Sequence, residues 1–99
     1  MYITVRRYEG IPNPRETGRR VTEGFVPLVS QVPGFVAYYW ADAGSGTMIS
    51  TGVFQDRTGA EESNKKAAEW IKQNPNLFTS PAQITAGEVV GHKTRKNLR

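Results

Sequence analysis

The side chains that could do chemistry in this 99-residue chain are mostly tyrosines, tryptophans and arginines. Arg6 and Tyr8 share one face of a segment with strand character, and together with Tyr39 and Trp70 they form a candidate pocket. Aromatic walls with a few polar groups are typical of a small-molecule site. Tyrosine hydroxyls and a guanidinium could stabilise an oxygen that becomes negatively charged. The alternatives are that Arg6 is only a solvated side chain and that Trp70 only packs in a core.

Several other kinds of site are excluded by composition. The chain has no cysteine, and its one histidine, His92, lies close to the C-terminus. A nucleophile–histidine–acid arrangement therefore cannot be built inside the domain, and thiolate chemistry is absent. The acids are scattered, so no metal site is predicted. The glycine-rich stretch at 44–46 joins two predicted strands and does not open a helix, so we interpret it as a turn and not as a phosphate loop.

The net charge of +4 is concentrated at the C-terminal end. Lys93, Arg95, Lys96 and Arg99 account for the whole excess of 13 basic over 9 acidic residues. We expect one domain over 1–91 and a basic tail over 92–99. A neutral body makes nucleic acid an unexpected partner, although the tail could attract an acidic one. The absence of an apolar run of about 20 residues or a signal-peptide pattern predicts a cytoplasmic protein without a membrane partner.

The segments that must position the candidate residues alternate between strand and helix patterns. Strands are predicted over 2–9, 35–41, 47–54 and 83–90, and helices over 14–32 and 60–73. Pro27 removes a helical hydrogen bond and should kink the first helix near Glu23. Thr58, followed by Glu61, is the expected N-cap of the second helix. The β-α-β-β-α-β order predicts a ferredoxin-like α+β fold, a four-stranded antiparallel sheet with both helices on one face.

The second predicted strand is apolar on both of its faces. Successive side chains of a strand point to opposite faces, and here neither alternating set is polar. Since both helices lie on one face, the other face needs cover from outside, and a second copy of the chain is the simplest cover. We assign Val36, Tyr38 and Trp40 to this homodimer interface and Tyr39 to the pocket side, although alternation alone leaves open which face meets the partner.

The chain resembles the antibiotic biosynthesis monooxygenase family of dimeric α+β barrels. The resemblance rests on the string VPGFVAYY over 32–39, on the element order and on the helix that carries AAEW over 67–70. It implies two sheets packed face to face in a homodimer, each subunit having a pocket between its sheet and its helices. It also implies a cofactor-independent monooxygenase that acts on phenolic or quinone-like substrates. The alternative is a non-enzymatic, small-ligand-binding or stress-associated dimer, so whether the chain is an enzyme stays open.

The same resemblance argues against haem degradation. The haem-degrading relatives use an asparagine on the first strand, a tryptophan on the second helix and a histidine shortly after it. Trp70 matches the tryptophan, but the first strand carries Arg6 and Arg7 and no histidine precedes His92. The remaining implied ligand is a small aromatic molecule.

Overall fold

Four antiparallel strands form one sheet in the order β2-β3-β1-β4. The computed structural model describes residues 1–95, so Lys96 and Arg99 of the predicted basic tail lie outside the described residues. The elements along the chain are β1 (Tyr2–Tyr8), α1 (Pro14–Arg20), η1 (Val21–Phe25), α2 (Val26–Val29), β2 (Phe35–Gly44), β3 (Thr47–Phe54), α3 (Arg57–Gln73) and β4 (Gln83–Glu88). The predicted α+β class and element order are confirmed.

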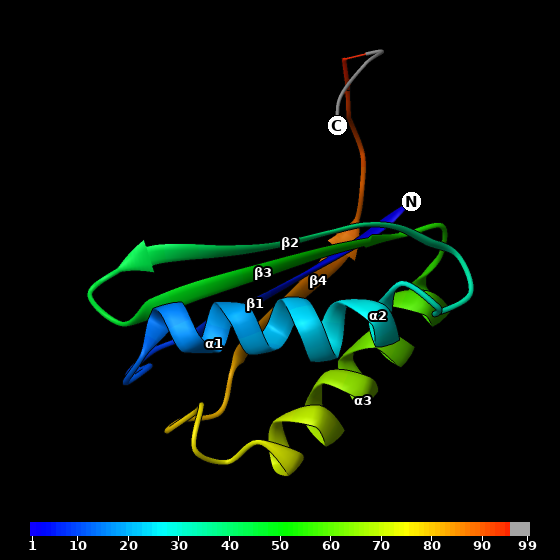
Figure 1. Cartoon of the computed structure of the whole chain (residues 1–99). Helices are drawn as coiled ribbons and strands as arrows, with labels where there is room; N and C mark the ends of the chain where they lie inside the picture. The colour runs from blue at the N-terminus through cyan, green and yellow to red at the C-terminus, as the bar shows by residue number, and fades with distance from the viewer. Residues whose placement is uncertain (96–99) are drawn as a thin grey trace.

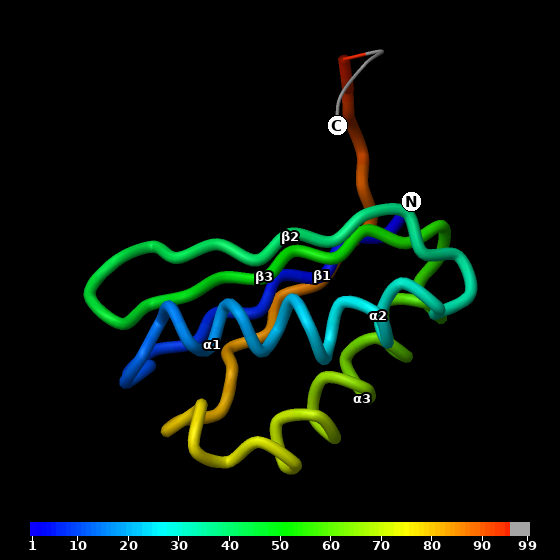
Figure 2. Tube along the Cα trace, viewed as in Figure 1, coloured from blue at the N-terminus to red at the C-terminus, as the bar shows by residue number. Residues whose placement is uncertain are grey.

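All helical segments lie on one face of the sheet (Figure 1). The trace in Figure 2 shows α1 and α2 running beneath β2 and β3, with α3 below them. The core fills the space between sheet and helices and includes Met48 and Phe54 from β3 and Val21 and Val29 from the helices. The opposite face of the sheet has no cover from residues 1–95. None of the helices in this part of the chain has the length and apolarity to span a membrane.

The first helical stretch is interrupted by a π-helical turn, η1. Pro27 has no N–H to donate to the Glu23 carbonyl, and the Val26 N–H instead bonds to the Val21 carbonyl. The predicted irregularity near Glu23 is therefore confirmed. The wider turn rotates the side chains that follow it around the helix axis, relative to their positions in a regular α-helix. As a result Val29 is buried, whereas the neighbouring Leu28 is 43% exposed.

Helix α3 begins earlier than predicted and has a different cap. The Asp56 side chain accepts a hydrogen bond from the Gly59 N–H at 3.0 Å, so Asp56 and not Thr58 is the N-cap. Aspartate and threonine are both good caps, and the choice depends on where the chain leaves β3. Glu61 pairs with Arg57 at 3.0 Å as a consequence of the earlier start.

A β-bulge in β2 decides which of its side chains face the helices. Phe35 pairs with Phe54 and Ala37 with Val53, which leaves Val36 as the extra residue. Beyond the bulge the even-numbered side chains point at the helices, so Tyr38 and Trp40 pack against the core. The placement of these two residues on the uncovered face was therefore wrong.

Tyr39 lies on the other face of β2 and is 56% exposed. Simple alternation from Phe35 would have placed it on the helix side, and the bulge is the physical reason that it does not lie there. Val36 is also exposed, at 47%. These two side chains and half-buried neighbours on β1, β2 and β3 make up the uncovered apolar face, which consists of Ile3, Val5, Val36, Ala37, Tyr39, Ile49 and Val53.

Candidate functional site

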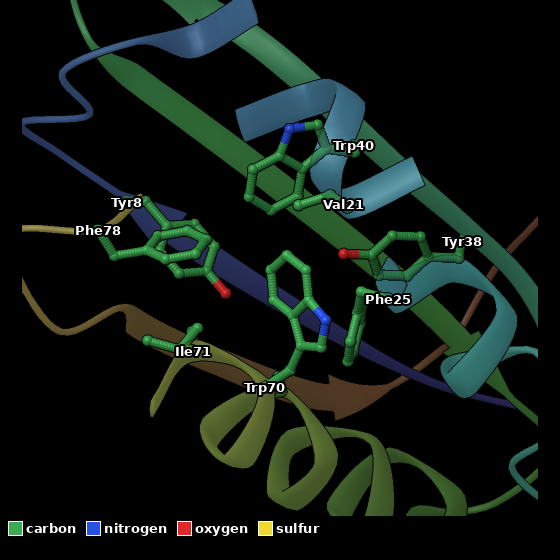
Figure 3. A pocket seen from close by; sticks show the side chains of 9 residues that line it. Tyr8, Val21, Phe25, Tyr38, Trp40, Trp70, Ile71 and Phe78 are labelled. Carbon is green, nitrogen blue, oxygen red and sulfur yellow. The ribbon is translucent and has the colours of Figure 1, made fainter. Parts of the chain in front are cut away.

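Aromatic side chains from five parts of the chain converge between the sheet and the helices (Figure 3). The ring of Tyr8 lies 5.3 Å from that of Trp40 and 5.1 Å from that of Phe78, measured between centroids. Phe25 of η1 lies 5.9 Å from Trp70 of α3. Tilted and edge-on contacts at these distances are favourable for aromatic pairs. The result is an aromatic cage, which we define as Tyr8, Phe25, Tyr38, Trp40, Trp70 and Phe78.

Arg6 lies beside this cage, and its side chain is only 7% exposed. Its Nε donates to the Tyr8 hydroxyl at 2.8 Å, and its Nη1 donates to Asn64 Oδ1 at 3.1 Å. The Asn64 Nδ2 in turn donates to Thr4 Oγ1 at 3.1 Å. No ion pair within residues 1–95 includes Arg6. A buried charge is costly unless it is paired, so this guanidinium, held by neutral acceptors, retains a strong attraction for an anion.

Two tyrosine hydroxyls adjoin this positive charge. Burial raises the pKa of Tyr8, against the opposing effect of the neighbouring Arg6 guanidinium. Burial also raises the pKa of Tyr38, against the effect of its hydrogen bond with Ser50. Figure 3 shows both hydroxyl oxygens pointing inward toward Trp70. Both hydroxyls therefore stay protonated at neutral pH and can donate hydrogen bonds to an anion that enters the cage.

The free space inside the site is small. One small cavity lies within the aromatic cage, and a second lies beside Arg6 and Asn64; each has a volume of about 10 Å³. Phe25, Tyr38 and Ala67 line both. Such a volume holds about one water molecule. A ligand with a ring system therefore needs some of the cage side chains to move before it can enter.

The structure brings three of the four predicted pocket residues to the same side of the sheet. Arg6 and Tyr8 are hydrogen-bonded to each other, and Trp70 contributes to the cage with Tyr8. Tyr39 lies on the opposite face and takes no part. Asn64 was not predicted as a site residue. The sequence could have indicated it, because Asn64 lies one helical turn from Ala60 on the apolar side of α3, where a polar side chain is unexpected.

The fold can be compared with known proteins. No model of a protein family matches the chain, and a search of curated proteins finds no match. Among solved structures, the monooxygenase ActVA-Orf6 of Streptomyces coelicolor, in complex with nanaomycin D, superposes with a TM-score of 0.74 at 13% identity, over 96% of this chain and 92% of that chain. SnoaB, a cofactor-independent oxygenase from Streptomyces nogalater, gives a TM-score of 0.70 at 14% identity, over 92% of this chain and 94% of that chain.

The chain has the fold of the antibiotic biosynthesis monooxygenases. Proteins assigned to this group from Nitrosomonas europaea and Chloroflexus aurantiacus also match over more than nine-tenths of the chain. The resemblance predicted from the sequence is therefore confirmed at the level of the fold. A protein of unknown function from Nitrosomonas europaea shares this monooxygenase-like fold with a TM-score of 0.76 at 20% identity, over 97% of this chain and 95% of that chain. The fold thus includes characterised oxygenases and proteins without an assigned activity.

Proposed function

We propose that this protein binds a phenolic or quinone-like small molecule between its sheet and its helices and promotes the oxygenation of that molecule without a cofactor. The observation that carries the proposal is the buried Arg6, which has no acidic partner among residues 1–95 and lies beside two protonated tyrosine hydroxyls and an aromatic cage. The likeness to cofactor-independent oxygenases of the same fold supports it.

In a reaction of this type the substrate itself reduces O2. The phenol loses a proton to solvent, and its anion passes electrons to O2. The resulting peroxide takes up a proton and becomes a hydroperoxide at a ring carbon that still carries a hydrogen. Loss of water from the hydroperoxide leaves a carbonyl at that carbon, so one oxygen atom enters the product and the other leaves as water. The protein's task is to stabilise the anion, and its residues supply the means: a positive charge on Arg6, two hydroxyl donors, and aromatic walls that exclude water and strengthen both interactions.

Oxygen uptake in the presence of a panel of hydroxyanthrone-type phenols tests the proposal. Arg6→Ala should lower kcat/KM by about 100-fold or more, because removal of one group that stabilises a developing anion has an effect of this size. Trp70→Phe keeps an aromatic wall and should have a smaller effect. Arg7→Gln serves as the control, because it removes a charge from the same strand but from the opposite face. A panel without any turnover would contradict the proposal.

The second candidate function is a small-ligand-binding dimer without catalysis. The residues that line the two cavities include neither a carboxylate nor an imidazole, which favours this alternative. The volume of about 10 Å³ in each cavity does not separate the two functions, because either one requires the cage to open. Native mass spectrometry of the purified protein separates the two functions: a co-purified aromatic ligand without oxygen uptake would support the non-catalytic one.

A further inference from the structure

An open groove runs along the helix side of β4, between this strand, the C-terminal half of α3 and the linker that joins them. Its volume is about 520 Å³, which is within the usual range for small-molecule sites of about 300–1,000 Å³. Its walls are mostly apolar and include Ala68 and Ile71 of α3, Phe78 of the linker, and Ile84 of β4, which is half exposed. The groove is thus large enough for a two-ring molecule without any side-chain movement.

The groove carries positive charge and no negative charge. Arg6 of β1 and Lys72 of α3 both line it, and none of its lining residues is an aspartate or a glutamate. The hydrogen bonds of Arg6 to protein groups are made by Nε and Nη1, so within the described residues Nη2 has no acceptor. A guanidinium in this state favours a ligand that brings an anionic oxygen, because charge-assisted hydrogen bonds are the strongest that it can make.

The groove also adjoins the aromatic cage. Ile71 and Phe78 line both the groove and the cavity inside the cage, and Arg6 lines both the groove and the second cavity. These three side chains therefore lie between the large open groove and the two small cavities. A molecule in the groove would touch the outer surface of the same residues that enclose the proposed reaction site.

We propose that this groove binds small apolar carboxylates, with the carboxylate on Arg6 and the hydrocarbon body against Ile71, Phe78 and Ile84. The positive charges of Arg6 and Lys72 suit a ligand with a single anionic group, and the apolar walls suit a flat or branched hydrocarbon. This site goes beyond the proposed function, since binding of a carboxylate requires no oxygen chemistry and holds whether or not the protein is an oxygenase.

A matched pair of ligands tests the site: naphthoate and the uncharged naphthylmethanol, which share their ring system. Calorimetric titration of the full chain should give an affinity for naphthoate about 10-fold or more above that for the alcohol, the usual size of a hydrogen bond to a charged group. Arg6→Gln should reduce this ratio to a few-fold, the share left to Lys72, and Lys72→Gln should lower naphthoate affinity a few-fold. Arg7→Gln should leave the ratio unchanged, because Arg7 lies on the other face of β1.

Ala68→Trp tests whether the ligand occupies the groove, because a bulky side chain at this position should block it. Ala68 is exposed on α3, where tryptophan does not disturb the core, and the indole would fill the groove and abolish binding of both ligands. Equal affinity of the wild type for naphthoate and naphthylmethanol would overturn the proposal, as would naphthoate binding that survives Ala68→Trp. If Arg6→Gln fails to fold by circular dichroism, the Lys72 and Ala68 variants still decide. Oxygen uptake, measured separately, distinguishes failure of this site from failure of the proposed function.

Discussion

Arg6 is the residue whose environment says most about this protein. The Arg6 guanidinium is 7% exposed, and its hydrogen-bond partners among the described residues are neutral. Burying a charge in this way lowers the stability of a fold, and a small domain has little stability to lose. Such charges are more often kept for what they bind than for stability. The position of Arg6 between the second small cavity and the open groove fits both an oxygenase site and a carboxylate site.

Because the pKa of Tyr38 is raised in the folded chain, the fold should lose stability at alkaline pH. Its burial favours the neutral phenol, so at high pH the folded chain keeps a proton that the unfolded chain releases. The free energy of unfolding should therefore fall as the pH rises above about 10, the ordinary value for tyrosine.

Tyr38→Phe should make this alkaline fall in the free energy of unfolding less steep, as measured by denaturant titration at several pH values. Tyr39→Phe is the matched control, because it removes a hydroxyl from the same strand outside the cage. An identical slope for Tyr38→Phe and the wild type would contradict the assignment of Tyr38 to the buried cage.

At the scale of the elements, the helical stretch beneath β2 fits closely against the two tryptophans of the site. It contains two glycines, Gly18 and Gly24, which differ in how much space surrounds them. A methyl group at Gly24 in η1 would lie 3.1 Å from Trp70 Nε1, whereas one at Gly18 in α1 would lie 3.8 Å from Trp40 Nε1. The first distance is too short for a comfortable contact and the second is an ordinary one.

Alanine at these two positions should have opposite effects on stability. Gly18→Ala should raise the free energy of unfolding by about 0.5–1 kcal/mol, because alanine is the better helix former. Gly24→Ala gains the same propensity but must displace a buried indole, a strain of about 1–3 kcal/mol, so its net effect should be a loss. Thermal unfolding with tryptophan fluorescence measures both, and a stabilising Gly24→Ala would show that Trp70 can move freely.

At the scale of the whole molecule, the uncovered face of the sheet exposes a contiguous apolar surface. Tyr39 and Val36 are 56% and 47% exposed, and the half-buried Ile3, Val5 and Val53 extend the same apolar surface. Contiguous apolar surfaces of this kind usually mark an interface. We propose that a second copy of the chain covers this face, so that two sheets pack against each other.

Light scattering at micromolar concentration should then give twice the subunit mass of 11.0 kDa. Val53→Lys places a charge at the centre of the proposed interface and should give a monomer, because an unpaired charge is costly to bury. Leu28→Lys is the matched control, since Leu28 is exposed on the helix side of the molecule. A wild-type chain that scatters as a single subunit would rule out this packing.

The element order, the α+β class and the irregularity near Glu23 could all be predicted from the sequence. These features depend on local properties: the spacing of apolar residues, the missing N–H of Pro27 and the turn residues between segments. The common face of Arg6 and Tyr8 was also predictable, because they are two residues apart on one strand.

Only the tertiary structure decided which residues form the site. The bulge at Val36 depends on the pairing of β2 with β3, and it exchanged the roles of Tyr38 and Tyr39. The bond between Arg6 and Asn64 joins residues 58 positions apart, which no local pattern encodes. Strand register and helix docking are settled by contacts between distant segments, so a shift of one residue in pairing moves a side chain from the pocket to the opposite face.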